Sequence, residues 1–395
     1  MTTLDYGRRR GVLAAADWSA AREAAWSAAH PLPAEYVPLA VGHRRVLAAD
    51  LAASTSLPAF TSSAMDGWAV AGGGPWNVVG TVLAGSTALA LAPGEAVVVA
   101  TGAQVPVGTT AVLRSEDGVM HAGRLEGAVR IGDNLRPAGE ESGPGEVLVA
   151  CGTPLSPAHL GLAAAGGYDV VPVVRRPTAA VLVLGDELLE RGVPGGGRVR
   201  DALGPQLPSW LGVLGLDVHS VQRVGDTLAD VVRALDSVAG SDLVVTTGST
   251  AAGPVDLLHS ALDVVGSSYV VDSVRCRPGH PMLLARPDRG GAVLGLPGNP
   301  QAAVAALLTL GSPYVGGLHG LQLADLELVR SREPLTAPAG STRLVLARRG
   351  DAGAVAVHHQ GSAMLRGLAE ADGYLVVPPG GCAADARLRW LPLPR

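Results

Sequence analysis

Between residues 176 and 315, segments with the apolar pattern of buried strands alternate with segments that have the apolar spacing of helices. Nearly continuous runs of valine, leucine and alanine occur within PTAAVLVLGDELLE, SDLVVTTG and GAVLGLPGN, as is typical of strands buried on both faces of a sheet. The segments LGPQLPSWLGVLGL, DTLADVVRALDSVAG and PQAAVAALLTL instead space their apolar residues by three and four, which indicates helices. This alternation predicts an α/β domain with a parallel sheet and crossover helices.

Two other regions carry the pattern of β-structure. Between residues 57 and 150, short valine-rich runs such as WNVVGTVLAG, EAVVVATGA and TTAVLRSED are separated by glycine and proline about every ten residues. The last stretch of the chain repeats this pattern in STRLVLARRG, GYLVVPPGG and ARLRWLPL. The sequence therefore predicts a β-rich domain before the α/β domain, and a small β-barrel or sandwich after it. Helices are expected at residues 17–30 and after the N-cap serine of LSPAHLGLAAAGG.

Composition narrows the class of protein. A chain of 395 residues suggests two to four domains, and its 48% hydrophobic content supplies ample core. The net charge of −5 argues against a nucleic-acid-binding protein. All 30 basic residues are arginine, which excludes a phosphate-binding or Schiff-base lysine. The three cysteines form no CxxC pair, and the N-terminal segment has no long apolar run, so we expect a soluble, cytoplasmic protein without a membrane span.

Polar residues follow each of the three buried strands of the α/β region. Ligands of open α/β sheets bind beyond the carboxyl ends of the strands. Any one such loop is most simply an ordinary turn with a capping acid, but three loops at one sheet edge indicate a ligand site. The candidate residues, strand by strand, are Asp186 and Glu187; Gly248, Ser249 and Asp256; and Pro297, Gly298, Asn299 and Pro300.

Several further residues have both a structural and a functional interpretation. Asp226 fits a helix N-cap, although carboxylates in this region could also hold Mg²⁺, which prefers oxygen ligands. Arg277 and His280 flank a Pro-Gly turn and could meet an anion, or could lie on a solvated turn. In the β-rich region, Asp66 precedes a glycine and fits a local turn acid. The remaining candidates in that region are Thr101, beside a glycine, and Arg136 and Glu141 in IGDNLRPAGEESG.

At these residues the chain resembles the MoeA family of molybdopterin molybdenumtransferases, to which the C-terminal region of gephyrin also belongs. SSAMDGWAV is very close to a family hallmark. The segments TGAQVPVGTTAV, GDNLRPAGEE, GDEL, TTGSTAAGPVD, RPGHP, LPGNP and GSAMLRGLAEADG follow in the family's order and spacing. The resemblance runs nearly from end to end, beginning at VGHRRVLAADL.

The resemblance implies a multidomain fold of four parts. An elongated domain comprises residues 1–54 and 139–175, and a β-rich domain is inserted at 55–138. A molybdopterin-binding α/β domain with a parallel sheet follows at 176–316, and a C-terminal β-barrel occupies 325–395. Family members are homodimers, with a site between the α/β domain of one subunit and the inserted domain of the other. The resemblance to gephyrin also implies a possible protein partner at the C-terminal domain.

The resemblance also implies the chemistry. The substrates are adenylylated molybdopterin and molybdate, and Mg²⁺ assists the release of AMP. Asp186, Glu187 and Asp256 are the implied metal ligands. The implied catalytic residues are Asp66, Thr101, Asp186, Glu187, Asp226 and Asp256, and the implied pterin-binding residues are Arg136, Glu141, Gly248, Ser249, Arg277, His280, Pro297, Gly298, Asn299 and Pro300.

The chain departs from the family pattern in ways that remove hydrogen-bonding groups. The family's Ser-Asn pair is Ala202-Leu203, and its two lysines around Pro-Gly are Arg277 and His280. In TTGSTAAGPVD, a family serine is replaced by Ala251 and a family acid by Pro254. The five acids among the implied catalytic residues are all retained, namely Asp66, Asp186, Glu187, Asp226 and Asp256. Two functions therefore stay open: a divergent molybdenumtransferase, and a catalytically weakened or inactive scaffold protein on the same fold.

Overall fold

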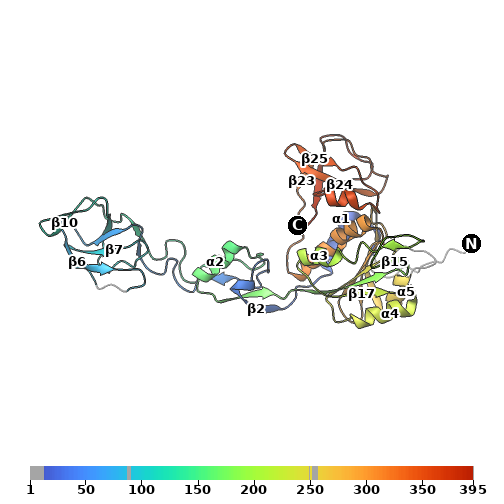
Figure 1. Ribbon diagram of the computed structural model, residues 1–395, viewed down its shortest axis with the longest axis horizontal. Helices are drawn as coiled ribbons and strands as arrows, with labels where there is room; N and C mark the ends of the chain where they lie inside the picture. The colour runs from blue at the N-terminus through green and yellow to red at the C-terminus, as the bar shows by residue number, and fades with distance from the viewer. Residues whose placement is uncertain (1–12, 87–89, 249, 251–256, 395) are drawn as a thin grey trace, which may run out of the picture. The chain divides into compact units, whose positions relative to one another are not determined.

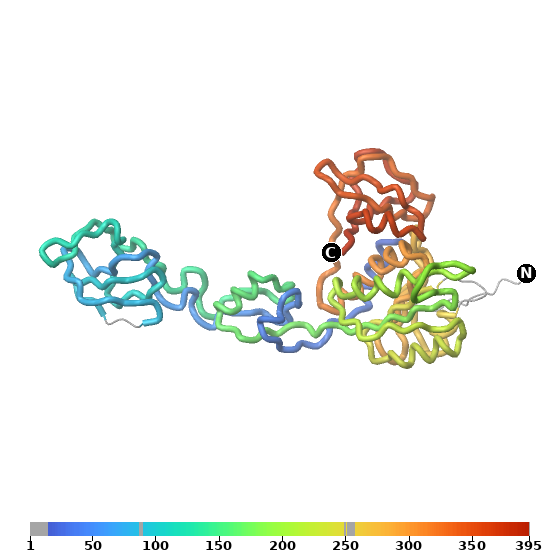
Figure 2. The backbone as a smooth tube through the Cα atoms, viewed as in Figure 1, coloured from blue at the N-terminus to red at the C-terminus, as the bar shows by residue number. Residues whose placement is uncertain are grey.

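The computed structural model describes residues 13–86, 90–248, 250 and 257–394. They divide into two compact units (Figures 1 and 2). Unit one comprises Met1–Glu35 and Val174–Arg395, and unit two comprises Tyr36–Val173. Within unit one, the Arg175 N–H donates a hydrogen bond to the Pro33 carbonyl at 2.8 Å, so the chain leaves and re-enters this unit at adjacent points. The finer domain boundaries at residues 54 and 139 stay a prediction.

A seven-stranded sheet forms the centre of unit one. Its order is β1 (Leu13–Ala16), β19 (Ser267–Val274), β21 (Leu283–Pro287), β22 (Ala292–Leu296), β18 (Leu243–Thr247), β14 (Thr178–Leu184) and β17 (Asp217–Val224). Strand β21 runs antiparallel to both of its neighbours, so the expectation of a parallel sheet is corrected to a mixed one. The reason is that the connections from β19 to β21 (residues 275–282) and from β21 to β22 (residues 288–291) are short, whereas a parallel pair needs a long crossover.

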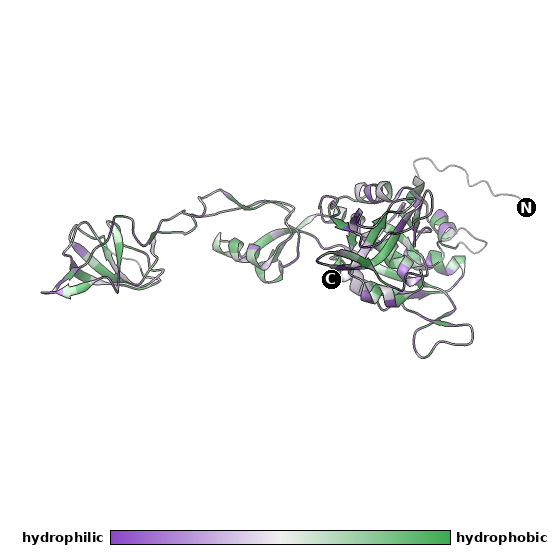
Figure 3. Ribbon diagram, turned by 90° about the horizontal axis from the view of Figure 1, so that it is seen from above, coloured by the Kyte–Doolittle hydropathy of each residue, from purple (hydrophilic) through white to green (hydrophobic). Residues whose placement is uncertain are grey.

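Helices cover both faces of this sheet. Alternate residues of β14 point to opposite faces, so that Leu182 packs in one core with α4 (Leu228–Ser237) and α5 (Leu257–Val264). Val181 and Val183 pack in the other core, which also contains residues of α1 (Trp18–Ser27), α3 (Leu207–Val213), α6 (Pro300–Ala306) and α7 (Ser312–Leu318). Figure 3 shows hydrophobic colouring concentrated on the strands between these helices.

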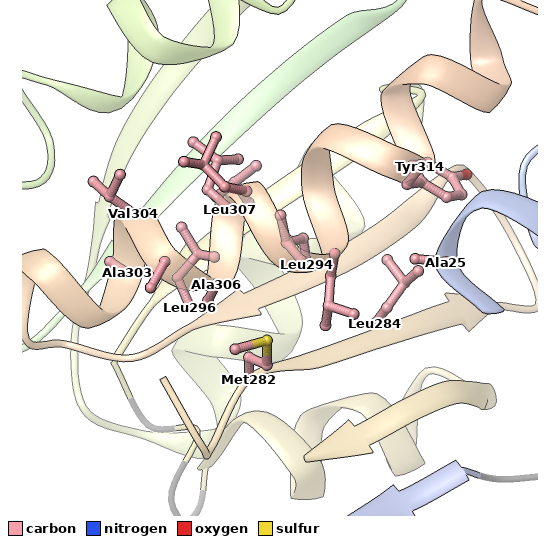
Figure 4. Close-up of a cluster of buried hydrophobic side chains, with 14 of the residues drawn as sticks. Ala25, Met282, Leu284, Leu294, Leu296, Ala303, Val304, Ala306, Leu307 and Tyr314 are labelled. Carbon is pink, nitrogen blue, oxygen red and sulfur yellow. The ribbon is translucent and has the colours of Figure 1, made fainter. Parts of the chain in front are cut away.

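The segment Pro300–Leu318 is the one long apolar helix found among the described residues. It runs through α6, the π-helical turn η2 (Leu307–Gly311) and α7. By length and composition it could cross a membrane, but 89% of it is buried inside the fold. Figure 4 shows Val304 and Leu307 of this segment beside Leu294, Leu296 and Met282. We therefore interpret it as a core helix.

The C-terminal part of unit one is a β domain. Its strands lie in the order β20 (Cys276–Arg277), β24 (Thr342–Gly350), β26 (Gly373–Val377), β27 (Arg387–Pro392) and β23 (Leu328–Arg330), with β25 (Gly353–Ala356) also on β24. Among the described residues only an isolated bridge between Ser331 and Ala354 joins the edges of β23 and β25. The expected closed barrel is thus corrected to an open sheet, because these two strands are too short to extend their pairing. Helix α8 (Leu365–Glu370) packs in the core shared with α6.

Unit two contains separate small cores. One includes residues of β2 (Ala34–Pro38), β3 (Leu51–Ala52), β12 (Val147–Val149), α2 (Pro157–Ala165) and β13 (Val170–Val174). The expected N-cap of α2 is present, because the Ser156 hydroxyl accepts a hydrogen bond from the His159 N–H at 3.3 Å. The other cores lie around a four-stranded sheet in the order β6 (Asn77–Val82), β7 (Glu95–Val99), β5 (Gly67–Val70) and β8 (Ala111–Arg114).

Candidate functional site

Four strands of the unit-one sheet end at the same edge. The pairing register places Leu184 beside Val224, and Thr247 beside both Val183 and Leu296. Because these strands are parallel, the loops that follow β14, β17, β18 and β22 begin side by side. The predicted residues on these loops are therefore brought to one edge of the sheet.

The loops after β14 and β17 are joined by a carboxylate. Oδ2 of Asp226 accepts a hydrogen bond from the Asp186 N–H at 3.0 Å. Asp226 is not the N-cap of α4, because the Thr227 hydroxyl takes that position and accepts from the Asp230 N–H at 3.1 Å. The side chains of Asp186, Glu187 and Asp226 are exposed. Three carboxylates thus lie on two adjoining loops that open to solvent.

The loops after β18 and β22 also adjoin. The Gly248 N–H donates to the Leu296 carbonyl at 2.9 Å, and Gly248 has a left-handed φ of +81°. A Cβ on Gly298 would lie 3.7 Å from the Gly248 Cα, which is van der Waals contact and places the two loops against each other. Ser249 and Asp256, which follow Gly248 in the sequence, lie outside the described residues, and their predicted contacts stay predictions.

The loop after β22 leads directly into α6. Pro297 is buried and Asn299 is exposed, and Pro300 occupies the first turn of the helix. Arg277 and His280 reach the same edge, because antiparallel β21 begins where β19 and β22 end. A Cβ on Gly279 would lie 3.4 Å from the Ala302 carbonyl oxygen, which places this turn against α6.

His280 and Arg277 differ in their hydrogen bonding and in the strands that they adjoin. His280 Nδ1 lies 2.8 Å from the Val274 carbonyl oxygen, which makes Nδ1 the donor and orients the ring. Arg277 is exposed and lies in β20, which pairs with β24 of the C-terminal β domain. Burial raises the pKa of the neighbouring Cys276 thiol to about 12, so this cysteine is not a nucleophile at neutral pH.

Two polar residues at this edge, Gln301 and Ser362, were not predicted as site residues. Asn299 Nδ2 donates to the Ser362 hydroxyl at 3.3 Å, and the Gln301 N–H donates to the Ser362 carbonyl at 2.9 Å. Gln301 is fully buried, and its side-chain amide, oriented with the nitrogen toward the C-terminal β domain, donates to the carbonyls of Gln360 and Gly361. The motif GSAMLRGLAEADG was a signal for Ser362, but nothing local in the sequence singles out Gln301.

Unit two brings together a second pair of predicted residues. Oδ1 of Asp66 accepts hydrogen bonds from the Thr101 N–H at 2.7 Å and from the Thr101 hydroxyl at 3.1 Å. The acid thus joins two loops, which a local turn acid does not do. The next residue must be glycine, because Gly67 has a φ of +152° and a Cβ there would lie 2.0 Å from the Leu113 carbonyl oxygen.

Arg136 and Glu141 are also in unit two. Arg136 lies in β11 (Leu135–Arg136), paired with β4 (Ser62–Ser63), a strand that precedes Asp66 closely in the chain. The Glu141 N–H donates to the Leu57 carbonyl at 2.8 Å, and its side chain is exposed. Within the described residues, neither side chain has a hydrogen bond to Asp66 or Thr101.

The donor chemistry at the unit-one edge fits a magnesium ion. Carboxylate oxygens are the ligands that Mg²⁺ prefers, and Asp186 and Glu187 supply them on one exposed loop. Among the described residues, however, no group of three or more potential ligands lies close enough together to hold a metal. The third predicted ligand, Asp256, lies outside those residues. The described part of the chain therefore supplies the right donor type but an incomplete set.

Comparison with known proteins covers nearly the whole chain. Residues 17–167 match the family model "MoeA N-terminal region (domain I and II)", residues 180–316 match "Probable molybdopterin binding domain", and residues 329–385 match "MoeA C-terminal region (domain IV)". The resemblance drawn from the motifs is thus confirmed.

Proteins of similar length match this chain over most of its length. A molybdopterin molybdenumtransferase of Synechococcus elongatus is 33% identical over 89% of this chain and 92% of its own. Molybdopterin molybdenumtransferase 2 of Mycobacterium tuberculosis is 31% identical over 87% of this chain and 90% of its own. The fold matches the crystal structure of the molybdopterin biosynthesis MoeA protein from Pyrococcus horikoshii with a TM-score of 0.81 and 24% identity, over 95% of this chain and 98% of that one. The chain therefore belongs to the MoeA family of molybdopterin molybdenumtransferases, enzymes of molybdenum cofactor biosynthesis.

Proposed function

We propose that the chain inserts molybdate into adenylylated molybdopterin in a Mg²⁺-dependent reaction that releases AMP. The observation that carries this proposal is the convergence of the predicted loops at one sheet edge. Asp186 and Asp226 are hydrogen-bonded there, and Gly248 and Gly298 adjoin. Acidic groups beside glycine-rich backbone suit a phosphate-bearing substrate accompanied by a divalent cation.

Each residue at this edge has a proposed role. Asp186 and Glu187, together with Asp256, hold Mg²⁺, which when bound neutralises charge on the phosphate oxygens. Asp226 orients the metal-binding loop through its hydrogen bond to the Asp186 N–H. Gly248 and the loop of Pro297, Gly298, Asn299 and Pro300 bind the substrate, together with Ser249, whose contact stays a prediction. Arg277 supplies positive charge and His280 a second polar group for the anionic substrate.

We further propose that the active form is a homodimer in the cytoplasm. Its two sites would each combine the unit-one edge of one copy with Asp66, Thr101, Arg136 and Glu141 of the other. Unit two carries apolar side chains in solvent that a dimer interface would cover, including Tyr36 at 75%, Val107 at 80% and Ile131 at 88% exposure. The C-terminal β domain is the proposed surface for a protein partner.

A reconstituted assay tests the proposed reaction. The purified chain is incubated with adenylylated molybdopterin, molybdate and Mg²⁺, and AMP is measured by chromatography. We expect AMP release that depends on molybdate and is abolished by Glu187→Gln. The control Asp236→Asn alters an exposed carboxylate in the last turn of α4 and should retain activity. Binding of the pterin without AMP release, and failure to restore a transferase-deficient cell, would instead support the scaffold function.

A further inference from the structure

Three arginine side chains converge on two consecutive backbone carbonyls just beyond Asp186 and Glu187. Arg223 Nη2 donates to the Leu188 carbonyl at 2.8 Å, and Arg198 Nη2 donates to the same oxygen at 3.3 Å. Arg200 Nη1 donates to the next carbonyl, that of Leu189, at 3.3 Å. Two guanidinium groups therefore share one oxygen atom, and the third lies one residue away.

The fold holds these arginines on separate segments. Strand β15 (Leu188–Leu189) pairs in parallel with β16 (Val199–Arg200), and Arg198 and Arg200 are at alternate positions and so share one face. Arg223 comes from β17, the edge strand of the large sheet, where it pairs with Val183. The convergence thus follows from the sheet and the β15–β16 pair together.

The cluster has more positive charge than the described residues neutralise. Glu190 lies 3.4 Å from Arg223 Nε, but its side chain is 66% exposed, and such pairs are weak. Across the described ranges, neither Arg198 nor Arg200 has a carboxylate within ion-pair distance. A guanidinium has five N–H donors, and each of these two arginines uses one on backbone. Both are exposed, so donors remain directed to solvent.

We propose that Arg198, Arg200 and Arg223 form a binding site for a phosphate-type oxoanion of the substrate. Planar guanidinium groups bind such anions through paired, charge-assisted hydrogen bonds. Leu188, whose carbonyl two of the arginines bind, directly follows Glu187. An anion bound by both the arginines and Mg²⁺ would therefore lie beside this part of the loop. The site also adjoins Ala202 and Leu203, whose side chains offer no hydrogen-bond donor, so the arginines supply the donors at this loop.

This inference deepens the proposed function, on which it rests for the identity of the substrate. Two sources offer the required anion: the phosphate groups of the adenylylated pterin, and molybdate. Both are oxoanions that present several acceptor oxygens to the guanidinium groups. Anion binding needs no turnover, so it can be measured separately from the reaction.

Isothermal titration of the full-length protein tests the site, with pyrophosphate and molybdate as separate probes. We expect saturable binding of at least one probe by the parent. The double variant Arg198→Gln with Arg200→Gln should bind it about tenfold more weakly or worse, because two charge-assisted contacts are lost. The matched control Arg191→Gln removes an exposed arginine from the segment between β15 and β16 and should leave the affinity unchanged. Melting temperatures verify folding, and Arg198→Gln alone replaces the double variant if that fails to fold.

The outcomes separate the possibilities. Tighter binding of pyrophosphate than of molybdate assigns the site to the pterin's phosphate groups, and the reverse order assigns it to molybdate. No saturable binding by the parent, or equal affinity in the parent and the arginine variant, would overturn the proposal. The arginines would then serve only to stabilise the β15–β16 segment through their hydrogen bonds to the Leu188 and Leu189 carbonyls. If the anions bind as expected while AMP release is absent, the oxoanion site stands and the proposed reaction fails.

Discussion

Asp242 is the carboxylate with the largest set of hydrogen bonds described in unit one. It accepts from Arg175 Nη2 at 2.8 Å and Nη1 at 3.0 Å, and from the Thr178 N–H at 2.7 Å and hydroxyl at 2.9 Å. Burial alone would raise the pKa of Asp242, but the hydrogen bonds from Arg175 and Thr178 outweigh it and hold the pKa below its usual 3.8. The ionised form therefore stabilises the start of β14.

Replacing Asp242 by asparagine should lower stability in a pH-dependent way. Because the folded-state pKa is depressed, the charge contributes fully above about pH 4 and is lost as the pH falls through the lower folded value. We expect Asp242→Asn to reduce the free energy of unfolding by about 1–3 kcal/mol at pH 7, and by less at pH 3. Urea titrations at both pH values measure this. The control Asp217→Asn alters an exposed partner of Arg176 and should have little effect; an equal loss at both pH values would contradict the assignment.

Asp66 should matter more for activity than for stability. Its carboxylate joins Thr101 to the loop before β5 on an exposed surface, and asparagine can keep an oxygen there while losing the charge. We expect Asp66→Asn to lose most AMP release with an unchanged melting temperature. Asp133→Asn is the matched control, since that exposed carboxylate accepts the Arg130 N–H at 2.9 Å in another turn of the same unit. Retained activity with reduced stability would make Asp66 a structural residue.

Helix α6 depends on a segment that follows it by about sixty residues in the chain. Its first turn is held by Ser362, by the carbonyls of Gln360 and Gly361 around buried Gln301, and by the Tyr374 hydroxyl, which donates to the Gln301 carbonyl at 3.4 Å. The C-terminal β domain thus fixes the start of the helix that follows the Pro297–Asn299 loop. Buried carbonyls without a donor are costly, so this contact should be sensitive to substitution.

The substitution Gln301→Met tests that contact. Methionine fills a similar volume but leaves the carbonyls of Gln360 and Gly361 without the amide donor. We expect a loss of about 1–3 kcal/mol in the free energy of unfolding, measured by urea titration. Gln322→Met changes an exposed glutamine beyond α7 and serves as the control. A variant as stable as the parent would show that these hydrogen bonds add no net stability.

Local patterns predicted strands β14, β18 and β22 of the large sheet, but not strands β1, β17, β19 and β21 or the antiparallel direction of β21. A buried strand such as Leu283–Pro287 has the same apolar pattern whichever way it runs, and its short connections were the informative signal. The residues that follow the strand pattern likewise placed Asp186 at a sheet edge, whereas Asp226 was interpreted as a helix N-cap or a metal ligand. The bond between them, and the bonds of Asp66 to Thr101 and of Gln301 to the C-terminal domain, join distant segments and could not be deduced from local pattern.

The proposed dimer predicts that two inactive variants complement each other. In a mixed dimer of Asp66→Asn and Glu187→Gln chains, one site would receive both replacements and the other neither. Co-expression with two affinity tags, without selection for the mixed species, should restore about a quarter of the parent activity, because half of the dimers are mixed and each has one intact site.

Light scattering provides the accompanying control for the assembly. A dimer has twice the chain mass of 39.8 kDa, and the mixed species should be captured by both tags. A mass near that of one chain, or no recovery of activity in a verified mixed dimer, would contradict a site shared between two copies.

The arrangement of unit one around the Pro33–Arg175 contact has a consequence for synthesis on the ribosome. Trp18 Nε1 donates to the Thr309 hydroxyl at 3.0 Å, Arg22 donates to the Leu308 carbonyl at 3.0 Å, and β1 pairs with β19. These residues are translated before unit two, yet their partners are translated only after the whole of unit two. Since domains generally fold as units during translation, unit two can complete its cores while the amphipathic α1 still waits for its partners. A segment translated before unit two is thus sheltered from water only after unit two is complete.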